Sequence, residues 1–400
     1  MTQKQPTLFI VAGEESGDRL GAALIRALKA RCGDDRLHFA GVGGHAMAEE
    51  GIRNLFPIDE LAIVGLAAIP KRLPAILRRI RETAAAAIAA QPDALVIIDS
   101  PDFTHRVARR VRARAPHIPI VDYVSPSVWA WRPGRAKAMR RYVDRVLALL
   151  PFEPEAHRRL GGPPCIYVGH PLSEQAASLR PNSQERARRD ANPPVLLVFP
   201  GSRNGELRRM LPDFAETVGR LRAQLGAIDV VMPTTPHLES RLREMIASWP
   251  QPPRVIVDAE EKRAAFRIAR AALAKSGTVT LELAVSGIPM VAAYKISSIE
   301  AAIARRVIKV PSVILANLVL GENVVPEFLQ EDCTPQKLTA ALLPLFGDGP
   351  ERARQLRAFA RLDAIMQIGE AEPARRAAEI VLETAGIACA EGAFPSATQN

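Results

Sequence analysis

Aromatic residues and cysteines are both scarce in this chain of 400 residues. Phenylalanine, tryptophan and tyrosine make up 5% of the sequence, which disfavours a nucleic-acid-binding protein that stacks bases on aromatic rings. The four cysteines, Cys32, Cys165, Cys333 and Cys389, are far apart and form no CxxC pair. Because this spacing fits neither a zinc motif nor a disulfide framework, we expect four reduced core thiols in a cytosolic protein.

The sequence also lacks a long apolar run and a recognisable leader peptide. No apolar stretch approaches the roughly 20 residues that a membrane-spanning helix needs, and the polar start MTQKQPT passes directly into a strand-like run. No DxD motif is present, so we expect no metal and no other cofactor. The net charge of +10 indicates an anionic partner, which can be a nucleic acid, a phosphorylated substrate or a membrane surface, unless it only reflects arginine-rich helix faces.

Short β-branched runs alternate with helical patterns along the chain, as they do in α/β proteins. The runs that predict buried parallel strands are 8–12, 37–41, 94–99, 118–124, 145–150, 195–199, 229–232, 254–257, 272–275 and 289–294. Helical periodicity between them is clearest at 18–31 and 74–90, and the polar, proline-punctuated stretch 171–194 predicts a linker. The pattern predicts two doubly wound, Rossmann-like α/β domains whose strands end at a shared cleft.

Two strand ends in the second half carry residues that suit an anion. After the strand at 195–199, Gly201 permits close backbone approach, and Ser202 and Arg203 can donate hydrogen bonds to a phosphate. The helix that begins near Asn204 directs its first amides to the same place. An arginine after a strand can also be a surface ion-pair residue, so this turn alone leaves both interpretations open.

The second of these strand ends is followed by Ser276-Gly277-Thr278, which opens a helix after Lys275. Serine and threonine there can cap the helix or hold a phosphate, and Glu282, one turn further on, can accept both hydroxyl groups of a ribose. Ser-Gly-Thr alone is a common helix start. Together with the glutamate and the run GIPMV, it is similar to the nucleotide-sugar site of GT-B glycosyltransferases.

The first strand leads into the loop AGEESGD, which has the outline of a phosphate-binding turn but carries three carboxylates. Its glycines, Gly13 and Gly17, do not form GxGxxG, which disfavours a dinucleotide site. We expect the loop to bind sugar instead, through Glu14, Ser16 and the amides around Gly17. Asp18 is expected to cap its own helix.

Nine segments, in order along the chain, resemble the lipid-A-disaccharide synthase family. They are AGEESGD (12–18), IIDSPDF (97–103), YVSPSVWAWRPGR (123–135), LLPFEP (149–154), VGHPL (168–172), PGSR (200–203), SGTVTLE (276–282), VIKVPSV (307–313) and VVPEFLQED (324–332). The resemblance extends from residue 8 to about residue 340. Ser100, Thr104, Asn204 and Ala316 depart from the residues that the family often has, which concerns acceptor and loop contacts but not the reaction class.

The resemblance implies a GT-B fold and a hexosyltransferase of lipid A biosynthesis in a Gram-negative bacterium. It implies transfer of 2,3-diacylglucosamine from UDP-2,3-diacylglucosamine to the 6-hydroxyl of 2,3-diacylglucosamine 1-phosphate, which yields a β(1→6) disaccharide 1-phosphate and UDP. The implied location is the cytoplasm, peripherally at the inner membrane. The oligomeric state is left open, and a homodimer is one of the alternatives. The implied parts are an acceptor-binding domain (1–185), a UDP-sugar-binding domain (186–365), helices that can cross back to the first domain (366–388) and a flexible tail (389–400).

Inversion at the anomeric carbon needs a base near the attacking hydroxyl and stabilisation of the departing diphosphate. Asp99, at the end of the strand 94–99, is the expected general base, although it can instead cap the turn that follows it. His170 is the other candidate base, but a histidine before proline is more often structural. The helix starts near 202–206 and 276–280 are expected to stabilise UDP.

The expected contacts divide between the two substrates. Those to the acceptor or sugar are Gly13, Glu14, Ser16, Gly17 and Ser125. Those to UDP are Ser202, Arg203, Glu206, Ser276, Gly277, Thr278, Glu282, Asn317 and Gln330, of which the last two rest on the resemblance alone.

Two stretches bear on membranes and nucleic acids. Residues 61–80 are apolar with interspersed basic residues, which suits either an interfacial membrane segment or a core helix with a basic edge. The stretch 129–141 interleaves Trp129 and Trp131 with basic residues, and we expect it to form a wall beside the acceptor's phosphate rather than a nucleic-acid site.

Three other functions stay open at this point. A nucleotide-sugar epimerase would isomerise its substrate without releasing UDP. A dinucleotide oxidoreductase would bind NAD, and a non-catalytic membrane-surface protein would bind lipid without forming UDP.

Overall fold

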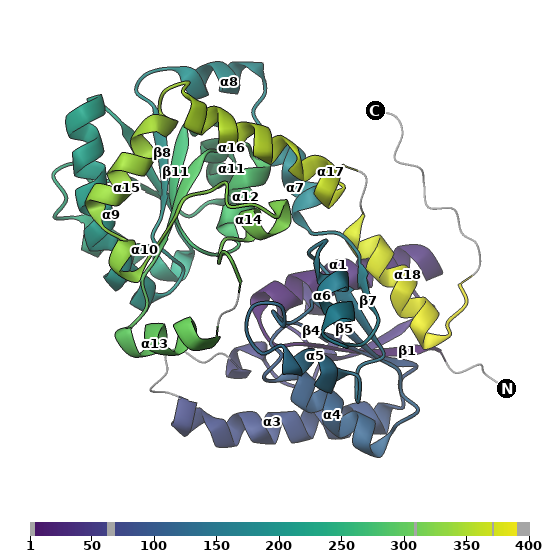
Figure 1. The fold of residues 1–400 in the computed structure, drawn as a ribbon. Helices are drawn as coiled ribbons and strands as arrows, with labels where there is room; N and C mark the ends of the chain where they lie inside the picture. The colour runs from purple at the N-terminus through teal and green to yellow at the C-terminus, as the bar shows by residue number, and fades with distance from the viewer. Residues whose placement is uncertain (1–4, 62–68, 308–309, 370–371, 390–400) are drawn as a thin grey trace. The chain divides into compact units, whose positions relative to one another are not determined.

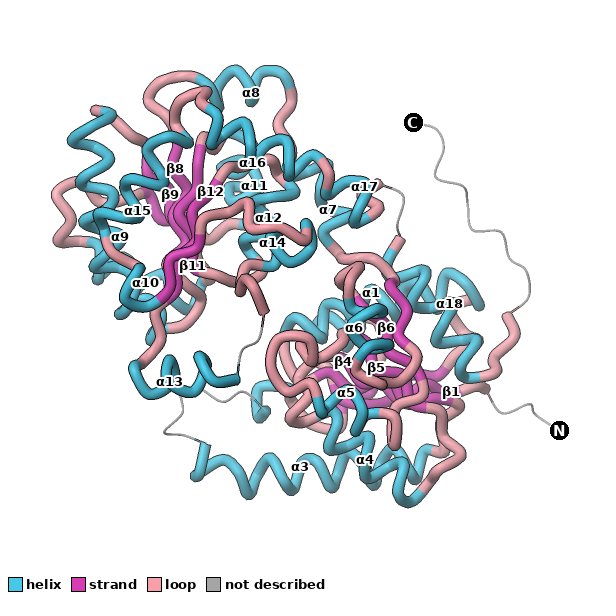
Figure 2. The backbone as a smooth tube through the Cα atoms, in the orientation of Figure 1, coloured by secondary structure: helices cyan, strands magenta, loops and turns pink. Residues whose placement is uncertain are grey.

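The computed structural model describes residues 5–61, 69–307, 310–369 and 372–389, and the chain divides into two compact units (Figure 1). The first unit comprises Met1–Pro171 and Ala371–Asn400, and the second comprises Leu172–Glu370. In each unit a parallel sheet lies between layers of helices (Figure 2). This architecture agrees with the predicted α/β fold class.

The sheet of the first unit has the order β3-β2-β1-β4-β5-β6-β7 among the described residues, and its neighbouring strands are parallel. The strands are β1 (Thr7–Ala12), β2 (His38–Val42), β3 (Arg53–Asn54), β4 (Ala94–Ile98), β5 (Ile120–Tyr123), β6 (Arg145–Ala148) and β7 (Cys165–Tyr167). The helices are α1 (Glu15–Cys32), α2 (His45–Glu49), α3 (Ile69–Ala90), α4 (Thr104–Arg114), α5 (Gly134–Met139), α6 (Glu153–Arg159) and α18 (Pro373–Ala385), with a 3₁₀ turn at Ile58–Leu61.

The sheet of the second unit has the order β10-β9-β8-β11-β12-β13, also parallel, among the described residues. The strands are β8 (Val195–Phe199), β9 (Asp229–Pro233), β10 (Arg254–Ile256), β11 (Ala271–Lys275), β12 (Met290–Tyr294) and β13 (Glu327–Leu329). The helices are α7 (Leu172–Leu179), α8 (Ser183–Asp190), α9 (Asn204–Leu225), α10 (Pro236–Ile246), α11 (Ala259–Ile268), α12 (Val279–Val285), α13 (Ser298–Val307), α14 (Leu315–Leu320), α15 (Pro335–Leu342), α16 (Pro350–Ala360) and α17 (Leu362–Met366), with 3₁₀ turns at Gln330–Asp332 and Leu343–Leu345.

Both sheets reverse their direction of strand addition at one point, which lies between β1 and β4 in the first unit and between β8 and β11 in the second. In open α/β sheets, ligands bind at the carboxyl ends of the strands at such a switch point. The strand order therefore marks one candidate ligand edge in each unit.

Helices cover both faces of the first sheet with apolar side chains. Residues of α1 and α18 pack on one face, and residues of α3, α4 and α5 pack on the other. Helix α18 lies against α1 and belongs to the first unit, although it follows the whole second unit in sequence. The chain thus returns to its first sheet after it has completed the second.

A disulfide joins Cys32, the last residue of α1, to Cys389, which follows α18. The expectation of four reduced cysteines is therefore wrong for this pair. The two residues are separated by 357 positions and come together only because α18 packs on α1, so local cysteine spacing carries no sign of the bond. Cys165 and Cys333 are free, and burial raises the pKa of Cys333 to about 11.

The stretch 171–194, which the sequence indicates as a linker, instead contains α7 and α8, and both pack on α11 of the second unit. Helix α8 begins with a capping box in which Asn182 and Glu185 bond each other's backbone amides. Arg189 is buried and donates to the carbonyl groups of Phe266 and Gly287. These bonds explain how so polar a stretch becomes part of a packed unit. Because α7 and α8 belong to the second unit, the first unit ends at Pro171, before the expected boundary at residue 185.

Part of the expected interfacial segment 61–80 lies outside the described residues, namely 62–68, as do residues 390–400 of the expected tail. From residue 69 onward the segment belongs to α3. Among the described helices, none is long and apolar enough to cross a membrane.

Candidate functional site

The switch point of the first unit places the loop after β1 beside the loop after β4. Ala12 and Ile98 are paired as the last residues of these strands. A side chain at Gly13 would place its Cβ 2.5 Å from the Cβ of Ser100, so only glycine allows the two loops to approach this closely. The expected acceptor-site residues of the first loop and Asp99 are thereby brought to one edge.

Asp99 lies at this edge, half-buried, in a left-handed backbone conformation with φ of 52°, and Ser100 follows it with φ of 44°. Two such residues in succession are costly for side chains other than glycine, and strain of this kind gathers at functional sites. The Ser16 hydroxyl donates to Oδ2 of Asp99 at 3.1 Å, and the Ser100 amide donates to Oδ1 at 2.7 Å. The Thr104 hydroxyl donates to the Asp99 carbonyl oxygen at 2.6 Å, which fixes the turn from behind.

The remaining residues of the first loop lie at the start of α1. Glu14 is exposed and directly precedes the helix, while Ser16 and Gly17 belong to its first turn. Ser16 is exposed and Gly17 is buried. Of this set, Glu14 and Ser16 present polar side chains at the edge where Asp99 lies, and Ser16 already contacts Asp99.

The sequence predicted that Asp18 caps its own helix, and this prediction is wrong. Asp18 is buried inside the first turn of α1, and its carboxylate accepts from the amides of Gly44, Ala46 and Met47 at 2.6, 2.9 and 3.1 Å. These amides belong to the N-terminus of α2, so Asp18 caps that neighbouring helix. Of the three carboxylates in the loop AGEESGD, that of Asp18 therefore has a structural role.

Ser125 is buried, and its Oγ lies 2.9 Å from Nε2 of His157. The neighbouring Trp129 donates its indole N–H to Oε1 of Glu153 at 3.1 Å, and the Leu150 amide donates to Oε2 at 3.0 Å. The loop after β5 is thus held in place by His157 and Glu153 of α6. Ser125, expected to contact the sugar, thus already has a polar partner inside the protein. Glu153 is a residue whose part in this anchor the sequence did not reveal.

Burial raises the pKa of Glu153 to about 7 from its ordinary value of 4.5, although the bonds from Leu150 and Trp129 oppose the shift. A folded-state pKa above the unfolded value means that the folded protein binds this proton more tightly. Glu153 therefore lowers the free energy of unfolding progressively as the pH rises from about 4.5 to about 7.

Glu153→Gln is expected to remove this pH dependence. The difference in unfolding free energy between wild type and variant should change across that window with a slope of up to about 1.4 kcal/mol per pH unit, favouring wild type at the acidic end. Chemical denaturation between pH 4.5 and 7.5 measures it. Glu155→Gln, an exposed change on the same helix, is the control, and a difference that stays constant with pH would contradict the assignment.

His170, the alternative base, is poorly suited to the role. Burial lowers its pKa to about 4. An imidazole with so low a pKa is neutral near pH 7 but takes up a proton weakly, which is the opposite of what a general base needs.

In the second unit, the turn after β8 is built around Glu206. Gly201 has φ of 130°, and a Cβ there would lie 2.5 Å from the Cβ of Glu206. Glu206 is buried, and its carboxylate accepts from the Ser202 amide at 2.9 Å and lies 3.1 Å from Nζ of Lys275. Glu206 therefore holds the turn together from inside and links it to the end of β11.

Arg203 presents the free positive charge of this edge. It is exposed and stands at the N-cap position of α9, and its guanidinium forms no hydrogen bond or ion pair within the described parts of the chain. Ser202 is exposed beside it. An unpaired guanidinium at the start of a 22-residue helix suits a bound diphosphate.

The turn after β11 meets the turn after β8 across paired strands, since Ala274 is opposite Phe199. Ser276 is buried and donates its hydroxyl to the Val313 carbonyl at 2.9 Å, whereas Gly277 and Thr278 lead into α12. Glu282 accepts from Nζ of Lys262 at 2.7 Å, a pairing that a ribose would have to share or displace.

Two residues expected near UDP are engaged within the protein. Asn317 is buried, donates to Ser312 and the Val325 carbonyl, and accepts from the amides of Val324 and Val325 at 3.0 and 2.9 Å. The Gln330 side chain accepts from the amide of Ile296 at 3.2 Å. Asn317 thus fixes the loop from 312 to 325, and sequence reasoning could place both residues but not their partners.

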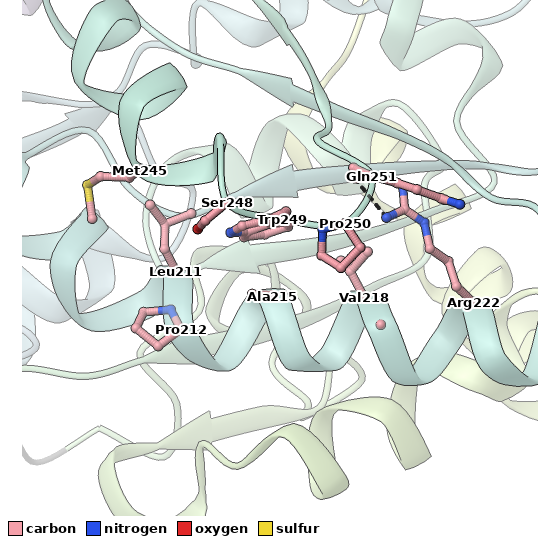
Figure 3. Close-up of a pocket in the computed structure, with 11 residues that line it drawn as sticks. Leu211, Pro212, Ala215, Val218, Arg222, Met245, Ser248, Trp249, Pro250 and Gln251 are labelled. Carbon is pink, nitrogen blue, oxygen red and sulfur yellow. Dashed lines mark hydrogen bonds between the residues drawn. The ribbon is translucent and has the colours of Figure 1, made fainter.

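A cavity of about 630 Å³ lies elsewhere in the second unit, between α9 and the segment after α10 (Figure 3). Trp249 lies over Ala215 and Val218 of α9 in this cavity, and none of the expected site residues lines it. Its walls precede β9 and β10, so it lies toward the amino ends of the strands and away from the ligand edge. Among the described residues, no cluster of three or more histidine, cysteine, aspartate or glutamate side chains is placed to hold a metal.

Solved structures with this fold include the S. aureus MnaA–UDP co-structure, with a TM-score of 0.63 and 12% identity over 97% of this chain and 99% of that chain. A UDP-GlcNAc 2-epimerase from Methanocaldococcus jannaschii in complex with UDP-GlcNAc and UDP has a TM-score of 0.59 and 13% identity over 94% and 99%. At such identities the likeness establishes the fold alone, which is the GT-B class of two parallel-sheet α/β units.

Sequence comparison is more specific. A family model described as lipid-A-disaccharide synthetase matches residues 8–381. The lipid-A-disaccharide synthase of Nitrobacter hamburgensis is 64% identical over 377 residues, which cover 94% of this chain and 95% of the relative. That of Rhodospirillum centenum is 42% identical and covers 94% of each chain. The chain therefore belongs to the lipid-A-disaccharide synthase family, the glycosyltransferases of lipid A biosynthesis.

Proposed function

We propose that the chain transfers 2,3-diacylglucosamine, with inversion, from UDP-2,3-diacylglucosamine to the 6-hydroxyl of 2,3-diacylglucosamine 1-phosphate. The observation that carries the proposal is the carboxylate of Asp99, held at the ligand edge of the first unit by Ser16 and Ser100. Family membership supports this choice of substrates. The first unit would then bind the acceptor and the second would bind the UDP-sugar.

In the proposed step, Asp99 takes the proton of the 6-hydroxyl as the oxygen attacks the anomeric carbon. The bond from that carbon to the diphosphate breaks on the opposite face, so the α-linked donor gives a β-linked product and UDP leaves with the bonding electron pair. Arg203 and the first amides of α9 are the groups that would stabilise its charge. At the neighbouring turn, Gly277 and Thr278 would hold the diphosphate as well, and Glu282 would accept the hydroxyl groups of the ribose.

Both substrates carry acyl chains, so the enzyme would meet them at a lipid surface. We place it in the cytoplasm, peripherally at the inner membrane. The net charge of +10 supports attraction to anionic lipid.

The direct test is UDP release from UDP-2,3-diacylglucosamine by the purified chain in detergent micelles. We expect UDP only when 2,3-diacylglucosamine 1-phosphate is present, together with a disaccharide 1-phosphate of matching mass. Isomerisation of the donor without an acceptor would instead reveal an epimerase, the activity named for one of the structural neighbours. The absence of both products would refute the proposal.

A further inference from the structure

The positive charge of the chain is concentrated in one short stretch. Residues 101–145 contain eleven of its 53 lysines and arginines but only three of its 43 aspartates and glutamates. One of those three, Asp122, is buried against His105. About a ninth of the sequence therefore carries a net +8 of the total +10, so the surplus is a local property rather than a general one.

Contacts spaced along α4 show that the two halves of this stretch form one surface. Arg135 donates to Asp102, just before α4, at 3.3 Å. In the middle of the helix the Arg109 guanidinium lies 4.8 Å from the ring centre of Tyr142. Arg112, near its end, pairs with Asp144. The segment 131–145, with α5, therefore runs beside α4 (Figure 1), and we call the surface formed by α4 and 131–145 the basic face.

Most cations of the basic face have no carboxylate beside them. The exposed ones that form no ion pair with any described residue are Arg106, Arg109, Arg114, Lys137, Arg140 and Arg141. Elsewhere the chain pairs such side chains along its helices, as Arg220 pairs with Glu216 and Arg243 with Glu239. The basic face thus projects a field that the protein does not neutralise itself.

One exposed aromatic ring borders this face. Trp131 is 38% exposed, with the guanidinium of Arg132 4.1 Å and that of Arg135 6.0 Å from its ring centre. Both arginines approach Asp102, which stands three residues after Asp99. The aromatic border of the basic face therefore lies at the ligand edge of the first unit, within the stretch expected to form a wall beside the acceptor's phosphate.

We propose that the basic face docks the first unit on the anionic headgroups of a bilayer, with Trp131 at the headgroup level beside the site. The inference rests on the proposed function, because acylated substrates reside in such a surface. Uncompensated arginines attract anionic lipid, and tryptophan favours the membrane interface. A nucleic acid fits less well, because a base-stacking surface needs several aromatic rings and this face exposes one among its described residues.

The test uses sedimentation of the full chain with vesicles of phosphatidylcholine alone or mixed with phosphatidylglycerol. Wild type should bind the mixed vesicles and be released by high salt. The triple variant Arg106→Gln, Arg110→Gln, Arg114→Gln, confined to α4, should bind them at least about tenfold more weakly. The matched control, Arg220→Gln, Arg243→Gln, Arg263→Gln, removes as many charges from the second unit and should bind like wild type.

UDP release from micellar substrates and thermal unfolding are measured on the same proteins, and both should be unchanged in the triple variant. Failure of the proposed function would appear as absent UDP release with normal vesicle binding, which separates it from failure of this inference. Wild-type binding by the triple variant, or equal loss in the control, would overturn the inference. Binding to a nucleic-acid oligomer is measured in parallel. If the triple variant loses that binding and still binds the vesicles, the inference is overturned as well.

Discussion

Asp99→Asn is expected to lower turnover by about 10²- to 10⁴-fold while the fold stays intact. Asparagine has nearly the volume of aspartate, and its Oδ1 can still accept from the Ser100 amide. Its Nδ2 can donate to the Ser16 hydroxyl, which then accepts instead of donating. The variant therefore keeps both bonds that orient the side chain and loses the basicity alone.

The measurement is kcat for UDP release, with KM for both substrates determined in parallel. A loss confined to kcat is the signature of a group that acts in the transition state. Asp102→Asn is the matched control, since it makes the same chemical change three residues further on at an exposed carboxylate that pairs with Arg135. Turnover within tenfold of wild type in Asp99→Asn would remove Asp99 from the role of base.

The strands that flank the switch points are those that the sequence predicts best. β1, β4, β8 and β11 are fully or almost fully buried, so each reads as a short uninterrupted apolar run. β3, β7 and β13 were missed because they are two or three residues long at sheet edges and are not buried. An edge strand of that length depends on its neighbour for its conformation, and its own residues carry no periodicity.

The same limit explains the error at 171–194. Asn182 and Glu185 carry the spacing of a capping box, a local signal for a helix start that the prolines and charges of the stretch outweighed. What makes α8 part of the second unit is the burial of Arg189 against distant carbonyl groups. A buried arginine is indistinguishable in sequence from the exposed arginines around it.

For the site, the sequence identifies the turns but not which side chains face outward. Asn317, Ser125 and Glu206 were all expected to contact substrates, and each is buried with polar partners inside the protein. Arg203 and Ser16, from the same motifs, are exposed. A motif records that a polar residue is required, and only the hydrogen-bond partners show whether it serves the ligand or the loop that holds the ligand.

Glu206→Ala is expected to lower kcat/KM for the UDP-sugar by about 10²-fold. The change removes the acceptor of the Ser202 amide and leaves Lys275 without its carboxylate partner inside the protein. Loss of one member of a buried ion pair costs roughly 3–5 kcal/mol, so the free energy of unfolding should also fall. The turn that carries Ser202 and Arg203 would lose its internal support even though neither residue is changed.

A support role and a direct contact with UDP give different results with Glu206→Gln. Glutamine keeps an oxygen for the Ser202 amide but cannot neutralise Lys275. If Glu206 supports the turn, Glu206→Gln should therefore recover part of the donor affinity and part of the stability that Glu206→Ala loses. As a direct ligand of UDP, Glu206 would affect donor affinity with little change in unfolding. Calorimetric titration with UDP and denaturation of both variants make the comparison, with Glu216→Ala, exposed on the same helix, as the control. Because Glu206 is buried and its carboxylate contacts both Ser202 and Lys275, we expect affinity and stability to fall and recover in parallel.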